Sequence, residues 1–564
     1  MKVMKRPIFY ILQLTFCAGL LTSCGDEWND HFDASTVDNG TLWQAIEAQE
    51  DLSNFALVVE ACGYDKVLDG SQTYSVFAPT NETFSKREAD SLVSEFQRQA
   101  AAGTRSNDNT VVRQFLQNHI ALYKHPVSSL TADSIVMMND KYMRLTPSTL
   151  SERNLLSTNA LYNNGLLFTI DRKLDYFPNV FEYLGHDHDL DSVYSFFNRY
   201  NTYEFSEAKS VPGEIVDGMT VYLDSVSELQ NVLFASYGLI NSEDSTYWLL
   251  CPTNDEWNRM VEEYEPYFTY PTTVNNRDSL QYINTRLAIM DGAFFSRTAN
   301  PDEAFQDSAI STKGETLTLL RRYGINDDES YYVYQRPFDE GGIFDGTEDV
   351  VCSNGHVRKA SHYNLSKYET FLQTIKVEAE NIIYQDTIIQ AVDPLVMREV
   401  TSSNPFYGQI SGNAFVEVQP DPATAQVTVG YRVPDVLSNV EYDVYAVFVP
   451  ATAYDTLAVK ETEKPYLVRS TLYYSNEYGK ESPRRFNSRI TVPADSVREV
   501  LLAKQQTFPT SSAGLPATLK LWIASAVTSS QTTTHSTTLR LDCILFKPHA
   551  QEATEEKAVR RSHK

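Results

Sequence analysis

The sequence has few cysteines and no excess of positive charge. Six cysteines among 564 residues are too few for a fold held together mainly by disulfides. Basic residues number 47 against 74 acidic ones, a formal net charge of −27, so the chain as a whole lacks the basic surface that nucleic-acid binding requires. With 42% hydrophobic residues it can still bury cores, and its length predicts about three domains.

The sequence also lacks the short motifs of common catalytic sites. It contains no GxSxG, no HExxH, no P-loop, no dinucleotide-binding glycine motif and no CxxC. The only dense group of metal-ligand residue types is His186, Asp187, His188, Asp189 and Asp191. Neighbouring side chains on a helix point about 100° apart, so these five cannot all converge. Because they lie where a helix is expected to begin, acidic caps are the favoured interpretation and a metal site the alternative. We therefore expect no catalytic residues, no metal, no cofactor and no enzymatic activity.

The first residues follow the pattern of a targeting signal. Lys2, Lys5 and Arg6 precede a mostly apolar stretch over residues 8–21, which is short for a membrane span and typical of a secretory signal. The stretch runs into Leu-Thr-Ser-Cys-Gly at 21–25, which resembles a bacterial lipobox. The resemblance implies that residues 1–23 are a signal peptide and that Cys24 carries a lipid that anchors the protein. A plain secretory signal with an incidental cysteine is the alternative.

Acidic residues follow Cys24 directly. Asp-Glu-Trp-Asn-Asp at 26–30 resembles the surface-export signal of Bacteroidetes lipoproteins, and a plain polar tether is the alternative. Residues 24–37 are accordingly expected to form a lipidated tether. The resemblance implies localisation at the outer membrane, lipid-anchored and facing the cell exterior. The strong negative charge argues against electrostatic docking onto anionic lipid.

Two stretches of the chain share one order of features. Helical periodicity over 41–62 is followed by a strand-like run, by Pro-Thr-Asn at 79–81, by a helical stripe at 111–120 and by Asn-Gly at 164–165 before another apolar strand. The same features return at 190–200, 247–257, 278–290 and 354–357. Features in the same order, about 175–190 residues apart, indicate an internal repeat.

These motifs resemble those of fasciclin-type domains. YSVFAPTNETF at 74–84 and NGLLFTIDRKL at 164–174 are similar to the two signatures of that family, and the second copy carries weaker forms of both. The resemblance implies two small α+β domains used for adhesion and interaction, at residues 38–178 and 179–374, the second with an insertion around 296–345. His119 falls where the family has a tyrosine–histidine pair, but Asn118 replaces the tyrosine. On a helical apolar face, a hydrogen-bonded core histidine is the favoured interpretation.

From about residue 376 the helical periodicity gives way to alternation. Val427, Val429, Tyr431 and Val433 share one face of an expected strand, with Thr428, Gly430 and Arg432 on the other. Residues 442–448 repeat the pattern, as do Leu539, Leu541, Cys543 and Leu545. Such period-two runs predict an antiparallel β-sandwich over residues 375–550, followed by a disordered tail at 551–564.

The two ends of this region resemble those of jelly-roll carbohydrate-binding modules. The resemblance rests on Val-Glu-Ala-Glu at 377–380 and Leu-Arg-Leu-Asp-Cys-Ile at 539–544. The expected fold class is therefore multidomain, α+β and all-β, with two tandem fasciclin-like domains followed by a jelly-roll-like β-sandwich.

Aromatic side chains are the candidate ligand contacts of the sandwich, since their rings can stack on pyranose faces. The candidates are Tyr473, Tyr474, Tyr478 and Trp522. Ordinary strand packing is the alternative for Trp522, and tyrosines also collect at strand edges.

The remaining cysteines near apolar residues are interpreted as buried thiols: Cys62, Cys251, Cys352 and Cys543. The sequence leaves open a Cys251–Cys352 bridge.

Two functions fit these features. In the first, the protein is a non-enzymatic cell-surface lipoprotein that serves as an accessory subunit of a starch-utilisation-like nutrient-uptake complex. The resemblance to Bacteroidetes lipoproteins then implies a TonB-dependent barrel and its lipoprotein lid as partners. In the second, it is an independent glycan-binding or adhesion lipoprotein with a polysaccharide as ligand.

Overall fold

The computed structural model describes residues 39–127, 132–244, 246–296, 308–310, 333–335, 337–392, 395–454, 464–486 and 488–549. The predicted signal peptide, Cys24, the predicted tether and tail, and most of the expected insertion at 296–345 lie outside them. The chain divides into two compact units, one with residues 1–176 and 205–228, the other with 177–204 and 229–564. Each unit is described by itself.

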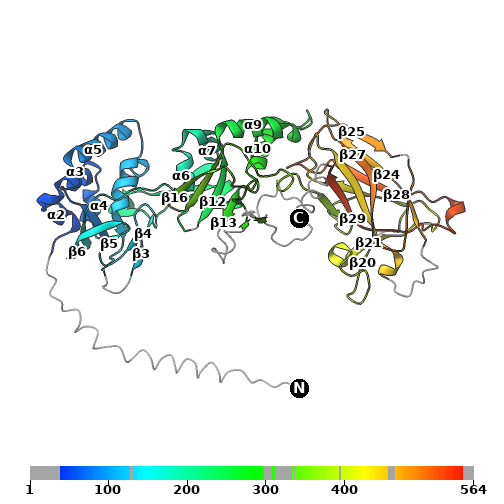
Figure 1. Ribbon diagram of the computed structural model, residues 1–564, viewed down its shortest axis with the longest axis horizontal. Helices are drawn as coiled ribbons and strands as arrows, with labels where there is room; N and C mark the ends of the chain where they lie inside the picture. Colours follow the sequence, from blue (N-terminus) through cyan, green and yellow to red (C-terminus); the bar gives the residue numbers. More distant parts are fainter. Residues whose placement is uncertain are drawn as a thin grey trace, which may run out of the picture. The chain divides into compact units, whose positions relative to one another are not determined.

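Unit 1 is an α+β domain built around one mixed sheet (Figure 1, blue to cyan). Its helical elements are α2 (Leu42–Glu47), η1 (Glu50–Leu52), α3 (Ser53–Ala61), α4 (Asp65–Asp69), α5 (Lys86–Ala101), η2 (Ser106–Asp108), η3 (Val112–Leu116) and η4 (Gln117–His119). Its strands are β1 (Tyr74–Pro79), β2 (Ile120–Leu122), β3 (Asp133–Val136), β4 (Tyr142–Leu145), β5 (Thr149–Leu150), β6 (Arg153–Tyr162) and β7 (Gly165–Ile170). The seven strands are ordered β2-β1-β7-β6-β5-β4-β3, and β1 and β7 run parallel.

Asn164 explains the Asn-Gly signature. Its Oδ1 accepts a hydrogen bond from the backbone N–H of Leu42 at 2.8 Å, and its Nδ2 donates to the carbonyl oxygens of Leu68 and Gly70, both at 2.7 Å. The next residue is glycine because a Cβ at Gly165 would lie 2.2 Å from the carbonyl oxygen of Tyr74. The side chain of Asn164 thus satisfies backbone groups at the start of α2 and at the C-terminal end of α4.

The first part of unit 2 repeats this arrangement. Its helical elements are α6 (Val180–Leu184), η5 (His188–Leu190), α7 (Asp191–Asn198), α8 (Val232–Tyr237), α9 (Asn254–Tyr264), η6 (Glu265–Phe268) and α10 (Arg277–Met290). Its strands are β12 (Tyr247–Pro252), β13 (Phe294–Ser296), β14 (Ser308–Ile310), β15 (Val333–Gln335), β16 (Glu348–Cys352) and β17 (Gly355–Ala360), while β8 (Asn201–Phe205) and β11 (Ser227–Asn231) lie where the chain passes between the units. The order β13-β12-β17-β16, with β12 and β17 parallel, matches β2-β1-β7-β6 of unit 1.

Asn354 repeats the role of Asn164. It accepts from the N–H of Val180 at 2.8 Å and donates to the carbonyl oxygens of Ile240 and Ser242, each at 2.8 Å. A Cβ at Gly355 would lie 1.7 Å from the carbonyl oxygen of Tyr247. The same sheet order and the same asparagine contacts confirm the predicted tandem repeat of α+β domains.

The asparagine of the Pro-Thr-Asn motif is also shared. Asn81 accepts from the N–H of Asn54 at 3.1 Å and donates to the carbonyl oxygen of Glu50 at 2.8 Å. Asn254 makes the equivalent bonds with Ser192 at 2.8 Å and His188 at 2.7 Å. The signature is therefore architectural, because in each copy it ties the end of a strand to a preceding helix.

A hairpin from the middle of the chain packs within unit 1. It consists of β9 (Val211–Val216) and β10 (Met219–Asp224), which fall inside the range that the sequence assigned to the second domain. The buried carboxylate of Asp224 accepts a hydrogen bond from the Tyr64 hydroxyl at 2.7 Å and one from Gln117 Nε2 at 3.4 Å. The hydroxyl of Tyr64 in turn accepts from Gln117 at 2.9 Å.

The rest of unit 2 is a β-sandwich (Figure 1, yellow to red). One six-stranded sheet has the order β20-β21-β29-β23-β27 with β18 paired to β29: β18 (Ile375–Glu378), β20 (Val396–Glu399), β21 (Ala414–Val418), β23 (Tyr442–Phe448), β27 (Arg498–Gln506) and β29 (Leu539–Pro548). The other has the order β19-β22-β28-β24-β25 with β26 paired to β24: β19 (Gln385–Ile389), β22 (Thr428–Val433), β24 (Tyr466–Ser475), β25 (Glu481–Arg485), β26 (Ile490–Val492) and β28 (Leu519–Ser525). Short helical turns are η7 (Ser411–Asn413), η8 (Ala451–Ala453) and η10 (Ser529–Gln531). The strand pairs that define these sheets are antiparallel, so the fold class predicted from the sequence is confirmed.

One predicted face of the sandwich is wrong. The alternation placed Cys543 and Leu545 on the same face as Leu539 and Leu541, but Leu539 and Leu541 belong to the main core and Cys543 and Leu545 to a separate cluster. The register of β29 against β23 shifts between Leu541 and Ile544, which is a β-bulge. A bulge adds one residue to a strand and so reverses the alternation beyond it.

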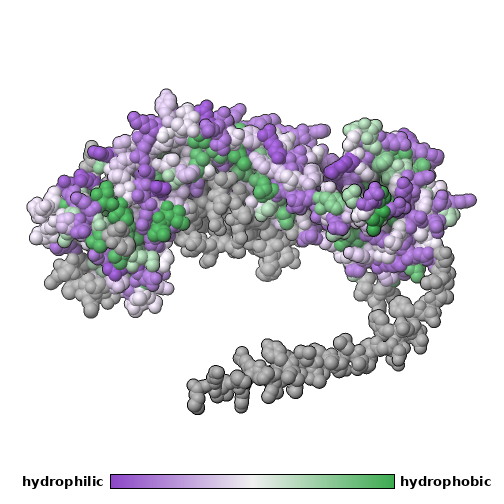
Figure 2. Space-filling model, turned by 180° about the vertical axis from the view of Figure 1, so that it is seen from behind, coloured by the Kyte–Doolittle hydropathy of each residue, from purple (hydrophilic) through white to green (hydrophobic). Residues whose placement is uncertain are grey.

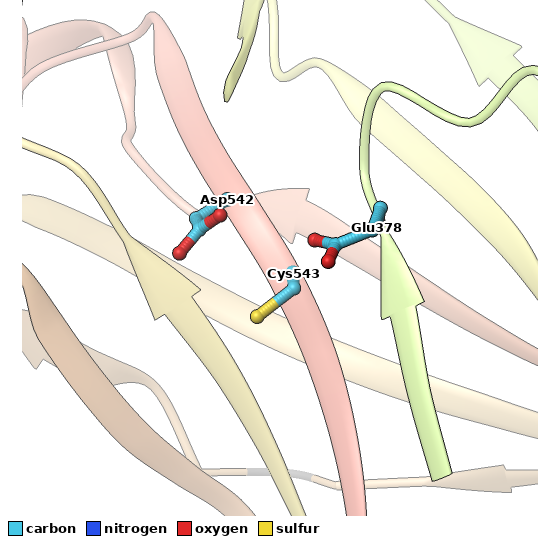
Figure 3. Close-up of side chains that lie close together, drawn as sticks. All are labelled: Glu378, Asp542 and Cys543. Atoms are coloured by element: carbon cyan, nitrogen blue, oxygen red, sulfur yellow. The ribbon is translucent and has the colours of Figure 1, made fainter. Parts of the chain in front are cut away.

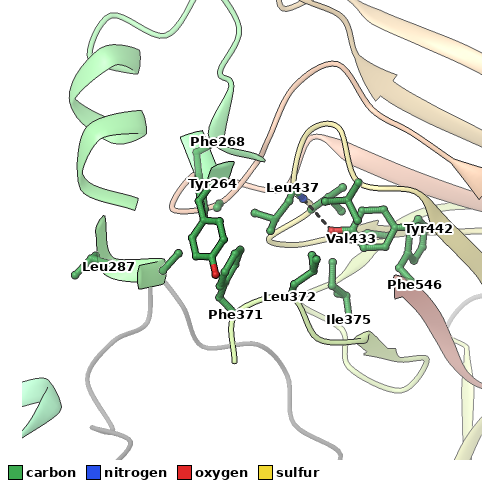
Figure 4. Packing of buried hydrophobic residues seen from close by; sticks show 14 of the residues in the cluster. Tyr264, Phe268, Leu287, Phe371, Leu372, Ile375, Val433, Leu437, Tyr442 and Phe546 are labelled. Carbon is green, nitrogen blue, oxygen red and sulfur yellow. Dashed lines mark hydrogen bonds between the residues drawn. The ribbon is translucent and has the colours of Figure 1, made fainter. Parts of the chain in front are cut away.

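The second α+β domain and the sandwich share one hydrophobic core in unit 2 (Figure 4). Phe268 and Phe371 from the α+β side are buried with Leu437 and Tyr442 from the sandwich side. Polar bonds cross the same junction, because Thr269 N–H donates to Ser438 at 2.9 Å and the Tyr270 hydroxyl to the carbonyl oxygen of Ala513 at 2.8 Å. The shared core and these bonds hold the two parts as one unit.

The described surface is mostly polar. Figure 2 shows hydrophilic residues over most of the visible face, interrupted by separate hydrophobic patches. Among the described residues, no helix is long and apolar enough to cross a membrane.

Candidate functional site

Two of the four predicted aromatic contacts lie side by side on the outer face of the sheet β19-β22-β28-β24-β25. Tyr473 on β24 and Trp522 on β28 have ring centroids 4.5 Å apart, tilted by 47°. Their neighbours along each strand, Leu472 and Leu521, are fully buried in the core, so alternation puts the two rings on the opposite, solvent-facing side. Both rings are partly exposed.

Gly430 makes room for the indole ring. It lies on β22 directly opposite Trp522, and a Cβ at this position would be 2.6 Å from Trp522 Cδ1. The indole therefore lies across the backbone of β22 and reaches the next strand, where its Nε1 donates to Asp386 Oδ2 at 3.4 Å. The glycine in the middle of this strand therefore has a packing reason.

Asp386 is the polar anchor of this face. It lies at a register shift in β19, between Gln385 and Thr387, and its side chain is only 7% exposed. Burial would raise the pKa of this carboxyl, but hydrogen bonds from Thr387 at 2.7 Å and from Arg432 Nε at 3.2 Å hold the pKa below its usual value. Asp386 is therefore ionised, and its fixed charge holds the indole N–H in place.

Charged side chains flank the two rings. Lys520 lies beside Tyr473 in the strand register, 2.9 Å from Glu481 and 3.6 Å from Asp386. Arg432 lies beside Lys520 on the next strand and is half exposed. An aromatic platform with hydrogen-bonding groups at its edge is suited to a sugar ring, whose face stacks on the aromatic ring while its hydroxyls meet polar groups.

The other two predicted aromatic residues lie elsewhere. Tyr474 points to the inner side of its sheet, with its ring centroid 6.1 Å from that of Phe508 and the Arg484 guanidinium 4.8 Å from its centroid. Tyr474 directly follows Tyr473 in the strand, so its side chain points to the opposite face of the sheet and does not belong to the outer face. Tyr478, which is 72% exposed, lies in the turn between β24 and β25.

Sequence reasoning placed Gly430 and Arg432 on the wetter face but did not identify Asp386 as a site residue. Strand alternation could have identified Lys520, because it is two residues from Trp522 and therefore faces the same side of the sheet. Asp386 could not be placed from alternation alone, because the bulge in β19 changes the phase at that residue.

A second polar group lies where the first and last strands of the sandwich pair. Figure 3 shows Glu378 on β18 with Asp542 and Cys543 on β29, and single ligand atoms of the three lie within 4.8 Å of one another. The backbone N–H of Ser411 donates to both oxygens of Asp542 at 3.2 Å, and the Ser411 hydroxyl donates to Glu378 Oε1 at 2.6 Å. Burial raises the pKa of Asp542 to about 7 and does the same for the nearby Glu380.

The donor set of this group only partly suits a metal ion. Carboxylate oxygens suit Ca²⁺, and Glu378 Oε2 and Glu380 Oε2 are buried without a hydrogen-bond partner. The Lys376 ammonium, however, lies 2.6 Å from Glu378 Oε1 and already supplies a positive charge. Burial raises the pKa of the Cys543 thiol, which keeps it protonated and a poor ligand. We assign no metal to this group.

The remaining polar candidates have structural roles. Buried His119 donates a hydrogen bond from Nδ1 to the Phe115 carbonyl oxygen at 2.7 Å, and its Nε2 accepts one from the Leu174 N–H at 2.9 Å. These bonds confirm the predicted hydrogen-bonded core histidine. Burial lowers its pKa to about 4. Asp187 caps η5 by accepting from the Asp189 N–H at 3.0 Å, and Lys359 bridges the two carboxylates at 2.9 and 2.7 Å.

The cysteines of the described residues are buried, and Cys251 and Cys352 are not joined by a disulfide. Burial raises the pKa of Cys251 and of Cys62, so these thiols are unreactive packing groups. The predicted lipidation site, Cys24, lies outside the described residues.

Comparisons with known proteins agree with the first part of the sequence assignment. Residues 50–175 match the family model of the fasciclin domain. No curated protein matches the chain. A solved FAS1 domain pair from the insect cell adhesion molecule Fasciclin I is 12% identical, with the match covering 57% of this chain and 98% of that one at a TM-score of 0.18.

Carbohydrate-binding modules are also among the solved structures that this chain is similar to. The CBM22-1 xylan-binding domain of Xyn10C from Paenibacillus barcinonensis is 11% identical, with 31% of this chain and 93% of that one covered at a TM-score of 0.19. The mannan-recognising module TmCBM27 is 14% identical, with 31% and 98% covered at a TM-score of 0.16. TM-scores this low establish no shared fold, so the architecture rests on the strand orders given above.

Proposed function

We propose that the protein is a non-enzymatic binding protein whose C-terminal sandwich holds a polysaccharide on the face formed by Tyr473 and Trp522. The observation that carries this proposal is the position of Trp522, whose indole lies over Gly430 and is held by the buried carboxylate of Asp386. Such a ring is fixed before a ligand arrives, so little side-chain entropy is lost on binding.

The two α+β domains serve as interaction or spacer modules in this proposal. Their signature residues Asn81, Asn164, Asn254 and Asn354 are engaged in backbone contacts, and His119 is buried. Since these groups hold the fold together, any adhesive contact made by these domains would use other surface residues.

Affinity electrophoresis of the purified chain in gels that contain single polysaccharides tests the proposal. We expect one or more polysaccharides to retard the wild type and a Trp522→Ala variant to migrate as it does without ligand. A matched control is Trp43→Ala, which alters a partly buried tryptophan of unit 1 and should leave retardation unchanged. Equal retardation of wild type and Trp522→Ala by every polysaccharide would overturn the proposal.

We further propose that the protein works at the outer surface of an outer membrane, held by a lipid on Cys24, as an accessory subunit of a TonB-dependent nutrient-uptake complex. Support comes from the lipobox-like residues 21–25 and the acidic residues 26–30. A glycan-binding subunit of such a complex would have a direct function, because it would release captured glycan close to the transporter.

Detergent extraction of tagged protein from its native membrane tests this second proposal. A barrel protein and its lipoprotein lid should co-purify with the wild type, and Cys24→Ala should abolish both membrane association and co-purification. Release of the wild type as a free protein that still binds polysaccharide would favour the independent glycan-binding lipoprotein instead.

A further inference from the structure

The outer face around Trp522 has a charge balance opposite to that of the chain. Four basic side chains project from this face, Arg432, Arg469, Arg485 and Lys520, against two acidic ones, Asp386 and Glu481. The chain as a whole has 47 basic and 74 acidic residues. A basic face on so acidic a protein is a local feature that general composition does not explain.

The strand register fixes where these cations lie relative to the rings. Arg485 on β25 is directly opposite Thr471 on β24, which is in turn opposite Trp522 on β28. Neighbouring strands lie about 4.8 Å apart, so the Cα atoms of Arg485 and Trp522 are separated by roughly 10 Å. Arg469 lies two residues before Thr471 on the same strand and so faces the same side.

Two of the four cations are available to a ligand. Asp386 is engaged by Arg432 and by the Trp522 indole, and Glu481 is engaged by Lys520. Arg469 and Arg485 are both exposed, and neither forms an ion pair within the described part of the sandwich. Arg469 donates only to the side-chain oxygen of Gln426, at 3.2 Å. Each guanidinium can therefore turn a fork of N–H donors toward an anion.

We infer that this face binds an anionic polysaccharide, one that carries carboxylate or sulfate groups, with sugar rings on Tyr473 and Trp522 and the anionic groups on Arg469 and Arg485. The inference rests on the proposed glycan-binding function and names its ligand class. Guanidinium groups pair with carboxylate and sulfate oxygens through two parallel hydrogen bonds, and the aromatic platform supplies the contact that a simple polyanion lacks.

Isothermal titration of the full chain against a panel of polymers tests this inference. The panel holds polygalacturonate for carboxylate, dextran sulfate for sulfate, xylan and mannan as neutral glycans, and polyglutamate and oligo-dT as polyanions without pyranose rings. We expect tighter binding of polygalacturonate or dextran sulfate than of any other polymer, and we expect that affinity to weaken as ionic strength rises. Which of the two binds distinguishes carboxylate from sulfate recognition.

Variants that remove positive charge test whether Arg469 and Arg485 bind the acidic polysaccharide. Arg469→Gln with Arg485→Gln should raise the dissociation constant for the acidic polysaccharide roughly tenfold at low ionic strength. Lys504→Gln, which removes an exposed charge from β27 in the other sheet, is the matched control and should change nothing.

Each alternative outcome is distinct. If neutral glycans bind as tightly as acidic ones and the double arginine variant binds normally, the inference is overturned while the proposed function stands. If polyglutamate or oligo-dT binds as tightly as the acidic polysaccharide, general attraction of polyanions replaces the inference. If no polysaccharide binds, the proposed function itself fails.

Discussion

The indole N–H of Trp522 reaches across a neighbouring strand to the carboxylate of Asp386, with 3.4 Å between Nε1 and Oδ2. The strand it crosses carries Gly430 at the crossing point. Because the ring is confined between a backbone without a side chain and an ionised, hydrogen-bonded carboxylate, its outer side is presented to solvent in one orientation.

A side chain at the crossing point should therefore displace the ring. Gly430→Val is expected to raise the dissociation constant for the bound polysaccharide roughly tenfold or more while the sandwich remains folded, since valine is compatible with a strand. Titration calorimetry measures the affinity and circular dichroism the fold. Thr428→Val on the same strand and face is the control and should bind as the wild type does. Normal binding by Gly430→Val would show that the position of the indole does not matter.

The two equivalent asparagines should be equally important for stability. Asn164→Ala and Asn354→Ala each remove three hydrogen bonds, from one backbone N–H and to two carbonyl oxygens, which should lower the free energy of unfolding of their own unit by about 2–4 kcal/mol. Urea unfolding measures this loss. Asn163→Ala, at an exposed neighbouring position, should have little effect. A loss below about 0.5 kcal/mol in either variant would contradict the proposed role.

The hairpin at 205–228 should depend on one buried hydroxyl. Tyr64→Phe removes the 2.7 Å hydrogen bond to Asp224, and we expect it to destabilise unit 1 by roughly 1–3 kcal/mol. Limited proteolysis should then cut near the turn at Asp217 and Gly218 more readily than in the wild type. In an Asp224→Asn background the same change should have a smaller effect, because no carboxylate is left to stabilise. Equal effects in the two backgrounds would mean that the hydroxyl and the carboxylate are not coupled.

Two buried carboxyl groups near the pairing of β18 and β29, those of Glu380 and Asp542, should make the sandwich less stable as pH rises. Burial raises the pKa of Glu380 and of Asp542 to about 7, above the values of the unfolded chain, so the folded state holds protons that the unfolded state has lost. This stabilisation is complete below about pH 4 and is lost as pH rises through about 7. Glu380→Gln should flatten the fall in the unfolding temperature between about pH 5 and pH 8. An unchanged slope would show that Glu380 does not titrate in this range.

Much of the fold could be predicted because its signals are local. Asn164 and Asn354 each precede a glycine and an apolar strand, and in the structure both side chains make the same set of hydrogen bonds with backbone groups. Alternation likewise located the strands of the sandwich. The assignment failed where a bulge changes the phase, as at Cys543 and Leu545, since one extra residue reverses every later side chain.

The site was only half predictable for a related reason. Tyr473 and Trp522 could be named from residue type, but Tyr474 is their sequence neighbour and faces the core. Asp386, about 140 residues before Trp522, meets it only through strand order, which no local pattern encodes. The packing of the 205–228 hairpin within unit 1 is equally non-local, because it depends on Tyr64 and Gln117 far earlier in the chain.

Hydroxyl-radical footprinting of the full chain with and without a saturating acidic polysaccharide tests the central claim most directly. We predict that oxidation of Trp522 and Tyr473 falls severalfold on binding, while that of exposed Tyr123 in unit 1 is unchanged. Protection of other residues, with Trp522 and Tyr473 oxidised as fast as in the free protein, would contradict a ligand site on this face.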